Sequence, residues 1–298
     1  MSSSNSTKAV MVALTGNGLI TILKFIAAFF TKSASMMAEA IHSSADCLNQ
    51  IFLLIGNKRT KKENDELHPF GYGREEYFWG FMVAILLFFG GAAYSFYEGI
   101  HKIGNPEPVQ HVTWALAVLG ISLIIEAKSF YVALKELRKT SKASFFKAIK
   151  KSVDINLIVI LLEDAAALIG LAIAFICTCL AIWLPIFDGI GSIMVGMTLC
   201  YVSYSLVNEL RKLIIGESMP RKDRVRIKEI ISDFELVTHV NRIKTMTMGK
   251  NNYLLLISIN GDDFMKVYNV EDTVEEMKRD IMKEFKQISE IYIEISEN

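Results

Sequence analysis

The stretch SMMAEAIHSSADCLNQ, residues 35–50, decides how the rest of this chain is understood. His42 and Asp46 are four residues apart, so on a helix they lie on one face about one turn apart, and Glu39 lies one turn before His42 on the same side. The apolar run resumes at residues 52–55, which places these polar groups inside a membrane-length helix. Ionisable side chains inside such a helix usually mark a functional site. The alternative is a short helix that ends in water, with Asp46 on its surface.

The composition indicates a membrane protein. The chain has 298 residues and is 52% hydrophobic, whereas soluble domains are about 45–50% apolar even with glycine counted. The formal net charge of +0 argues against nucleic acid as the main partner. The polar residues 1–7 carry no charge ahead of a short apolar core, so no cleavable signal peptide is expected. The cysteines all lie in apolar stretches without a C-x-x-C pair and are expected to be small buried hydrophobes: Cys47, Cys177, Cys179 and Cys200.

A membrane-spanning helix needs about 20 mainly apolar residues, and the chain has candidates at 9–30, 34–55, 77–97, 112–134, 155–182 and 186–207. Basic residues gather between spans two and three and between spans four and five, while the odd-numbered connections are poor in charge. The positive-inside rule therefore places the even connections and both termini in the cytoplasm. The protein is expected in the cell (inner) membrane, although the sequence does not reveal which membrane houses it. Residues 1–208 are predicted to form a membrane all-α bundle of six transmembrane helices.

The composition changes after Asn208, and residues 209–298 are charged and soluble in character. Apolar residues at three- and four-residue steps predict helices, and alternating apolar residues predict strands. The expected elements are a helix at 223–235, strands at 240–247 and 253–260 joined by a turn at 249–252, a helix at 270–285 and a strand at 290–296. The order α-β-β-α-β predicts a C-terminal cytoplasmic α+β domain of the ferredoxin-like kind.

The fifth predicted span holds two adjacent carboxylates, Glu163 and Asp164. Adjacent positions on a helix are about 100° apart, so at most one of them faces a central site. They form either a hydrogen-bonding pair between helices or a metal site, in which Asp164 joins His42 and Asp46. Nitrogen with carboxylate oxygen suits Zn²⁺ and also serves Mn²⁺, Fe²⁺ or Co²⁺. Small residues that let the second and fifth spans approach closely flank these acids: Ser43, Ser44, Ala45, Ala165, Ala166 and Ala167.

These features together resemble the cation diffusion facilitator family, and in particular its branch that includes the mitochondrial zinc transporter. The loop HPFGYGREE at residues 68–76 is similar to the family stretch H-P-[YF]-G-[HY]-G-[KR]-x-E. The polar pattern of the second span, the Glu-Asp pair of the fifth, Asp188 at the start of the sixth and the α-β-β-α-β tail occur in the order typical of the family. The resemblance runs from about residue 9 to the end of the chain.

The resemblance implies export of a divalent metal from the cytoplasm in exchange for protons, by a homodimer in the lipid bilayer. It implies no prosthetic group, and the transported metal is zinc, with manganese, iron or cobalt as alternatives. His42 and Asp46 match the family's [HD]-x-x-x-D of span two, and Asp164 matches the last residue of H-x-x-x-D in span five. Ile160 replaces the histidine of that second motif, and Glu163 is the expected replacement ligand, followed by water. The lost imidazole modestly favours Mn²⁺ or Fe²⁺.

The other ionisable residues receive smaller roles. His239 is the tail's lone histidine and is expected to end a loop, so the tail is expected to dimerise rather than to sense metal. His68 with Asp65 or Glu66 is a candidate for a weak metal site. Buried ion pairs, in preference to a proton relay, are expected for the charged residues of the first and fourth spans: Lys24, Glu126 and Lys128.

Two other function classes compete with transport. A membrane-embedded metal enzyme needs a metal with an open position and a dedicated base, and the H-E-x-x-H pattern that often supplies them is absent from the sequence. A non-transporting scaffold or metal sensor would use the tail as its active part. The sequence also lacks G-x-x-x-x-G-K-[ST], which argues against ATP-driven transport. The prediction is a transporter and not an enzyme.

Overall fold

The chain folds into two compact units in the computed structural model, which describes residues 2–60, 62–140, 155–249, 252–261 and 267–296. The first unit comprises Met1–Leu54 and Gly80–Asn208. The second comprises Ile55–Trp79 and Glu209–Asn298. The boundary at residue 208 is the one that the change in composition predicts. The segment 55–79 differs from the predicted division, because it belongs to the same compact unit as the tail.

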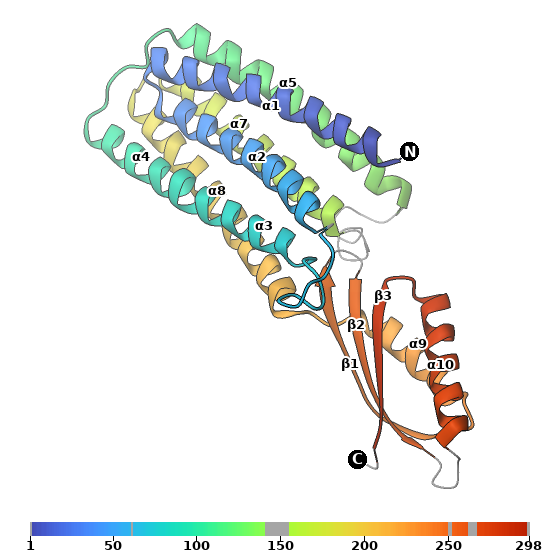
Figure 1. Cartoon of the computed structure of the whole chain (residues 1–298). Helices are drawn as coiled ribbons and strands as arrows, with labels where there is room; N and C mark the ends of the chain where they lie inside the picture. The colour runs from blue at the N-terminus through green and yellow to red at the C-terminus, as the bar shows by residue number, and fades with distance from the viewer. Residues whose placement is uncertain (1, 61, 141–154, 250–251, 262–266, 297–298) are drawn as a thin grey trace. The chain divides into compact units, whose positions relative to one another are not determined.

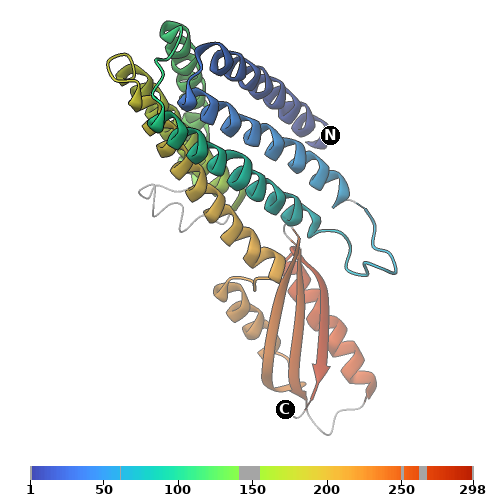
Figure 2. The same cartoon turned by 90° about the vertical axis from the view of Figure 1, so that its left-hand side faces the viewer.

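The first unit is a bundle of long helices that run alongside one another (Figures 1 and 2). One stretch is helical from α3 to α4 through a π-helical segment, η1, that contains Gly90 and Gly91. Glycine pairs and π-bulges are common places for a long helix to depart from regular geometry. The helices are α1 Ser2–Thr31, α2 Ala34–Arg59, α3 Glu75–Leu86, η1 Leu87–Ala93, α4 Tyr94–Gly104, α5 Val112–Thr140, α7 Ile155–Leu180 and α8 Ile186–Ile215.

Four helical stretches of the described chain are long and apolar enough to cross a membrane: Leu14–Thr31, Glu75–Gly104, Val112–Val132 and Ile186–Ile215. The helix α2 falls short because Glu39, His42 and Asp46 interrupt its apolar character. Within α7 the apolar stretch among the described residues is Asp164–Leu180, which is shorter. Six crossings therefore stay a prediction, since α2 and α7 do not qualify by length and composition alone.

Small residues let the helices of the first unit approach closely. Many of the buried core positions are alanines, packed against Leu119, Leu171 and Leu199. The helices α4 and α8 meet at Gly99 and Gly189, where a Cβ on either glycine would lie 2.8 Å from the carbonyl oxygen of the other. Close helix contacts through small residues are typical of membrane helices. Large apolar side chains lie on the outside, as expected of helices that face lipid: Phe29, Phe89, Ile124, Ile176 and Tyr201.

The tail forms a three-stranded sheet with two helices. Its elements are α9 Arg221–Ser232, β1 Val237–Gly249, β2 Asn252–Gly261, α10 Val267–Glu284 and β3 Ile288–Ile295. They follow one another in the order that the periodicity predicts. The sheet order is β1-β2-β3, with β1 antiparallel and β3 parallel to the central strand β2. The parallel pair is possible because α10 carries the chain back to the start of the sheet.

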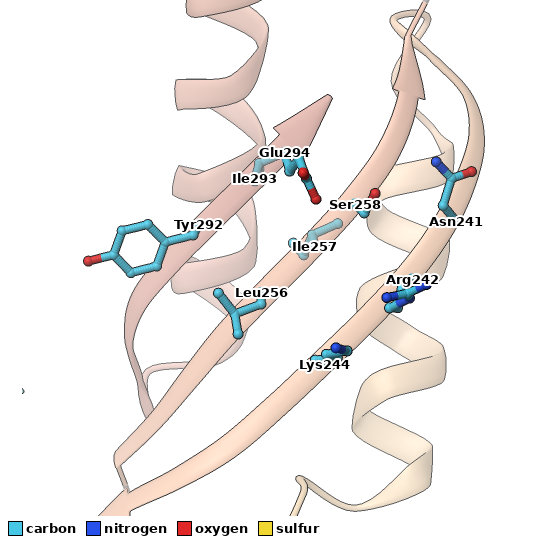
Figure 3. A pocket seen from close by; sticks show the side chains of 9 residues that line it. All are labelled: Asn241, Arg242, Lys244, Leu256, Ile257, Ser258, Tyr292, Ile293 and Glu294. Carbon is cyan, nitrogen blue, oxygen red and sulfur yellow. The ribbon is translucent and has the colours of Figure 1, made fainter. Parts of the chain in front are cut away.

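The two faces of this sheet differ. One face packs on the helices through Leu255, Ile257 and Ile259 of β2, together with apolar residues of α9 and α10 such as Ile231 and Ile281. The other face carries Leu256 and Tyr292, which are 41% and 53% exposed, and a shallow pocket of about 310 Å³. Figure 3 shows the side chains at this pocket, with the two helices behind the sheet.

The segment 55–79 joins the second unit through contacts with the end of β1. The Arg74 guanidinium donates from Nε and Nη2 to the carbonyl oxygen of Thr247, at 3.2 and 3.0 Å. A Cβ on Gly73 would lie 2.5 Å from the carbonyl oxygen of Met248, so only glycine lets the loop approach this closely. Because of these contacts the loop belongs to the compact unit of the tail, although the sequence assigns it to the membrane domain.

Candidate metal site

The helix α2 places three ionisable side chains along one side, as the spacing of the sequence predicts. His42 is 4% exposed and Glu39 is fully buried, whereas the Asp46 side chain is 32% exposed. The Nε2 atom of His42 lies 3.9 Å from Oδ2 of Asp46. The imidazole and the carboxylate therefore lie about one helical turn apart on the same side of α2.

The imidazole of His42 has unused hydrogen-bonding capacity. Both ring nitrogens are buried, and neither has a hydrogen-bond partner among the described residues. Buried polar atoms are nearly always satisfied, so an unsatisfied pair calls for an explanation such as a bound ion. Histidine binds a metal through a ring nitrogen that makes no hydrogen bond to another group.

Carboxylates of α5 and α7 face this stripe of α2. The hydroxyl of Ser129 donates to Oδ2 of Asp164 at 3.3 Å. Asp164 and Asp46 interact electrostatically, and Glu126 interacts with both of them and with His42. The structure therefore brings oxygen ligands from three helices to the same part of the bundle. Glu126 is a member of this group, although the sequence suggested only an ion-pairing role for it.

The ligands do not close into a coordination sphere. No group of three or more His, Cys, Asp or Glu side chains within the described residues is arranged tightly enough to hold a metal ion. The pair of His42 and Asp46 is the close contact, and Asp164 stands across from it. The side chains of Glu163 and Ile160 lie outside the described residues, so the role of Glu163 stays a prediction. A metal would have to draw the carboxylates of α2 and α7 together.

A buried ion pair lies beside His42. The ammonium of Lys24 donates to Oγ of Ser43 at 2.7 Å and to Oε2 of Glu39 at 3.3 Å. Lys24 is 1% exposed and Glu39 is fully buried. The sequence suggested that Lys24, Glu126 and Lys128 form buried pairs. The close partner of Lys24 is instead Glu39, and Lys128 is exposed on α5. The single lysine in the apolar span of α1 was the signal that such a partner was needed.

A second buried network fixes the start of α2. The carboxylate of Asp188, at the start of α8, accepts hydrogen bonds from the Ser33 hydroxyl at 2.6 Å and from the backbone N–H groups of Ala34 and Ser35 at 2.7 and 3.1 Å. The ammonium of Lys102 lies 3.8 Å away. An anion at a helix N-terminus satisfies N–H groups that have no partner within the helix and complements the helix dipole. Asp188 thereby ties α2 to α8.

The loop 62–72 is a poor metal site because its carboxylate is already engaged. Asp65 accepts hydrogen bonds from the Tyr72 hydroxyl at 2.6 Å and the Lys62 ammonium at 2.9 Å, and its Oδ1 lies 3.2 Å from Nδ1 of His68. The Tyr72 hydroxyl and then the Lys62 ammonium hold the pKa of Asp65 well below its usual range. A metal would have to displace this lysine before it could bind.

His239 corrects a smaller expectation. The sequence predicts that it ends a loop, but it lies within β1, where it is paired with Asn260 in the sheet and is exposed. The strand β1 begins earlier than predicted because Val237 already pairs with Gly261. No described group of metal-binding side chains includes His239.

Comparison with known proteins identifies the family of the chain. A family model described as the cation efflux transmembrane domain matches residues 10–215. The chain is 32% identical over 283 residues to the human protein named proton-coupled zinc antiporter SLC30A9, mitochondrial. The aligned region covers 93% of this chain and 50% of that protein. It is 30% identical to metal tolerance protein C4 of Arabidopsis thaliana, over 89% of this chain and 59% of that protein. It is 24% identical to the manganese efflux system protein MneP of Bacillus subtilis, over 98% and 96% of the two chains.

The chain spans about half the length of the first of these relatives. The family match nevertheless covers the helical unit that holds His42, Asp46 and Asp164. Because that match extends over more than half of the chain, the chain belongs to the cation efflux family, the cation diffusion facilitators, whose members are membrane transporters and not enzymes.

Proposed function

We propose that this protein exports a divalent transition metal ion from the cytoplasm in exchange for protons, and that the metal is zinc. The observation that carries the proposal is the buried imidazole of His42, which has two unpartnered ring nitrogens and lies 3.9 Å from Asp46. Asp164 and Glu163 complete the ligand set, with His42 and Asp46 supplied by α2. Membership of the family and the name of the human zinc antiporter support zinc and proton coupling.

The exchange follows from competition for the same atoms. A metal ligand must be deprotonated, so His42 and the carboxylates hold either a dication or protons. Histidine ordinarily titrates near pH ~6.5, so modest differences in proton concentration across a membrane change its occupancy. Metal displaces protons when the site faces the cytoplasm, and protons displace metal when it faces the other side.

Manganese is the second candidate metal. Ile160 stands where the family pattern has a histidine, so the site holds one imidazole and several carboxylates. Oxygen ligands suit Mn²⁺ and Fe²⁺ better than a site with two imidazoles does. The likeness to a manganese efflux protein supports this alternative.

The arrangement in the membrane completes the proposal. Six helical stretches cross the bilayer of the cell membrane with both termini in the cytoplasm, and α2 and α7 cross because their polar side chains face one another and not lipid. The tail is a cytoplasmic domain of the ferredoxin-like kind, and it makes the protein a homodimer. The open face of its sheet supports this role, with Arg242 and Lys244 on β1 at one edge and Glu294 on β3 at the other. A two-fold axis along the strands would set the basic edge of one copy against the acidic edge of its partner.

Flux measurements in proteoliposomes test the transport proposal. We expect zinc uptake by the wild type to follow an imposed proton gradient, and His42→Ala and Asp46→Ala each to abolish it while the protein still expresses and folds. Glu98→Gln, on α4, serves as the control and should transport normally. Wild-type uptake by Asp46→Ala would disprove the assignment. A folded wild type that moves neither zinc nor manganese would favour a metal-sensing scaffold.

A further inference from the structure

The buried lysine of α1 lies within the group of candidate ligands. Its ammonium bonds to Ser43 and Glu39, which are the residues next to His42 and one turn before it on α2. Lys24 also interacts electrostatically with His42, Asp46 and Glu126. A lysine inside a membrane helix is costly to bury, and such residues normally pair or act in function.

The partner of this lysine, Glu39, is placed to be a metal ligand but is held aside. It is three residues before His42 and on the same side of α2. Its Oε2 lies 3.3 Å from the Lys24 ammonium. Its Oε1 is buried without a hydrogen-bond partner among the described residues and lies 2.6 Å from where a Cβ on Gly170 of α7 would stand. Only a glycine at residue 170 leaves room for the carboxylate in this position.

The charges of the group show what the lysine does. The described carboxylates near His42 are Glu39 and Asp46 from α2 and Glu126 from α5. Asp164 from α7 interacts with Asp46 and Glu126, and the ammonium within the group comes from Lys24 of α1. Without the Lys24 ammonium, the Glu39 carboxylate would lose its close ion-pair partner and would be free to ligate a metal held by His42 and Asp46. More oxygen ligands favour Mn²⁺ and similar hard cations, whereas Zn²⁺ prefers four ligands with nitrogen among them.

We propose that Lys24 determines the metal specificity of this transporter by holding Glu39 out of the coordination sphere. The inference rests on the proposed function and deepens it. Lys24 is a positioning residue: it touches Glu39 and Ser43 and acts on the metal through them. Ile160 removes one imidazole from the site, and Lys24 offsets that loss by withdrawing one carboxylate, so that zinc remains preferred over manganese.

The test compares zinc with manganese in the full-length protein. Uptake of each metal into proteoliposomes gives a ratio of kcat/KM values, and calorimetry on purified protein in detergent gives a ratio of Kd values. We expect Lys24→Gln to lower the zinc-to-manganese ratio about tenfold, because a carboxylate joins the ligands. The double variant Lys24→Gln/Glu39→Gln should return the ratio to that of the wild type, since it removes the added carboxylate as well.

Two results would overturn the inference. One is an unchanged ratio in folded Lys24→Gln, and the other is a double variant that keeps the altered ratio of the single one. If Lys24→Gln does not fold, Glu39→Gln decides: its ratio should equal that of the wild type, and a loss of zinc affinity would show that Glu39 already binds the metal. If wild-type vesicles carry neither metal, the proposed function fails, while the binding ratios of the same proteins still decide the role of Lys24.

Discussion

His42 and Asp164 are held in different ways by their surroundings. The ring nitrogens of His42 have no partner among the described residues, whereas Asp164 accepts a hydrogen bond from Ser129 of α5. A group that donates a hydrogen bond to a metal-binding side chain fixes the orientation of that side chain, and its removal weakens metal binding. In the proposed site, Ser129 thus orients the ligand that comes from α7, and no described hydrogen bond orients the ring of His42.

We expect Ser129→Ala to weaken zinc binding about tenfold and to leave the maximal rate of transport largely unchanged, because the ligand remains but loses its orientation. The measurement is the KM and kcat of zinc uptake in proteoliposomes. Thr198→Ala is the matched control, since that hydroxyl bonds to the carbonyl oxygen of Met194 in its own helix. A KM equal to that of the control would remove Ser129 from the site.

At the scale of the helices, the position of α2 depends on Asp188. Its carboxylate accepts hydrogen bonds from the first backbone N–H groups of α2 and lies near the buried ammonium of Lys102. The helix that carries His42 and Asp46 is thereby tied at its first turn to α8. Sliding or tilting of α2 during transport must either carry the start of α8 with it or break this network.

We expect Asp188→Asn to lower the free energy of unfolding by about 3 kcal/mol, because it leaves a buried ammonium without its charged partner. An amide also offers one acceptor oxygen where the carboxylate serves three donors. Denaturant unfolding in detergent micelles measures the change. Glu107→Gln, an exposed residue of the adjoining loop, is the control. Equal stability of the two variants would show that α2 is held by other contacts.

At the scale of the whole molecule, the proposed homodimer would use the open face of the tail sheet. Two helices cover the other face, and this one exposes Leu256 and Tyr292 between a basic and an acidic edge (Figure 3). A face that carries both charges on opposite edges is complementary to itself under two-fold symmetry. The surface thus suits a copy of the same chain.

We expect the double variant Leu256→Glu/Tyr292→Ala to shift the purified protein from dimer to monomer, because it places charge at the centre of an apolar contact. Size-exclusion chromatography with light scattering measures the mass. Val225→Glu, which changes an exposed apolar residue of α9, is the control and should stay dimeric. A variant that remains dimeric would place the interface elsewhere.

The sequence alone determined those features that depend on neighbours along the chain. Hydrophobic runs predicted the helices, and the periodicity of apolar residues predicted the elements of the tail in order. Both patterns depend only on residues close together in the sequence. The spacing of His42 and Asp46 likewise placed them on one face of α2. The order of motifs from the second span to the tail indicated the family, which the comparison confirms.

Contacts between distant segments were decided by the tertiary structure. Lys24 forms its close ion pair with Glu39 of α2. Asp188 binds the start of α2 from 154 residues away, and Arg74 bonds its loop to β1. A buried charge must have an opposite charge or a hydrogen-bonding group beside it. The local sequence shows that such a partner is required but does not identify it. Which partner is chosen depends on how the helices pack, and that is settled by small residues such as Gly170 and Gly189, whose positions in space no local period records.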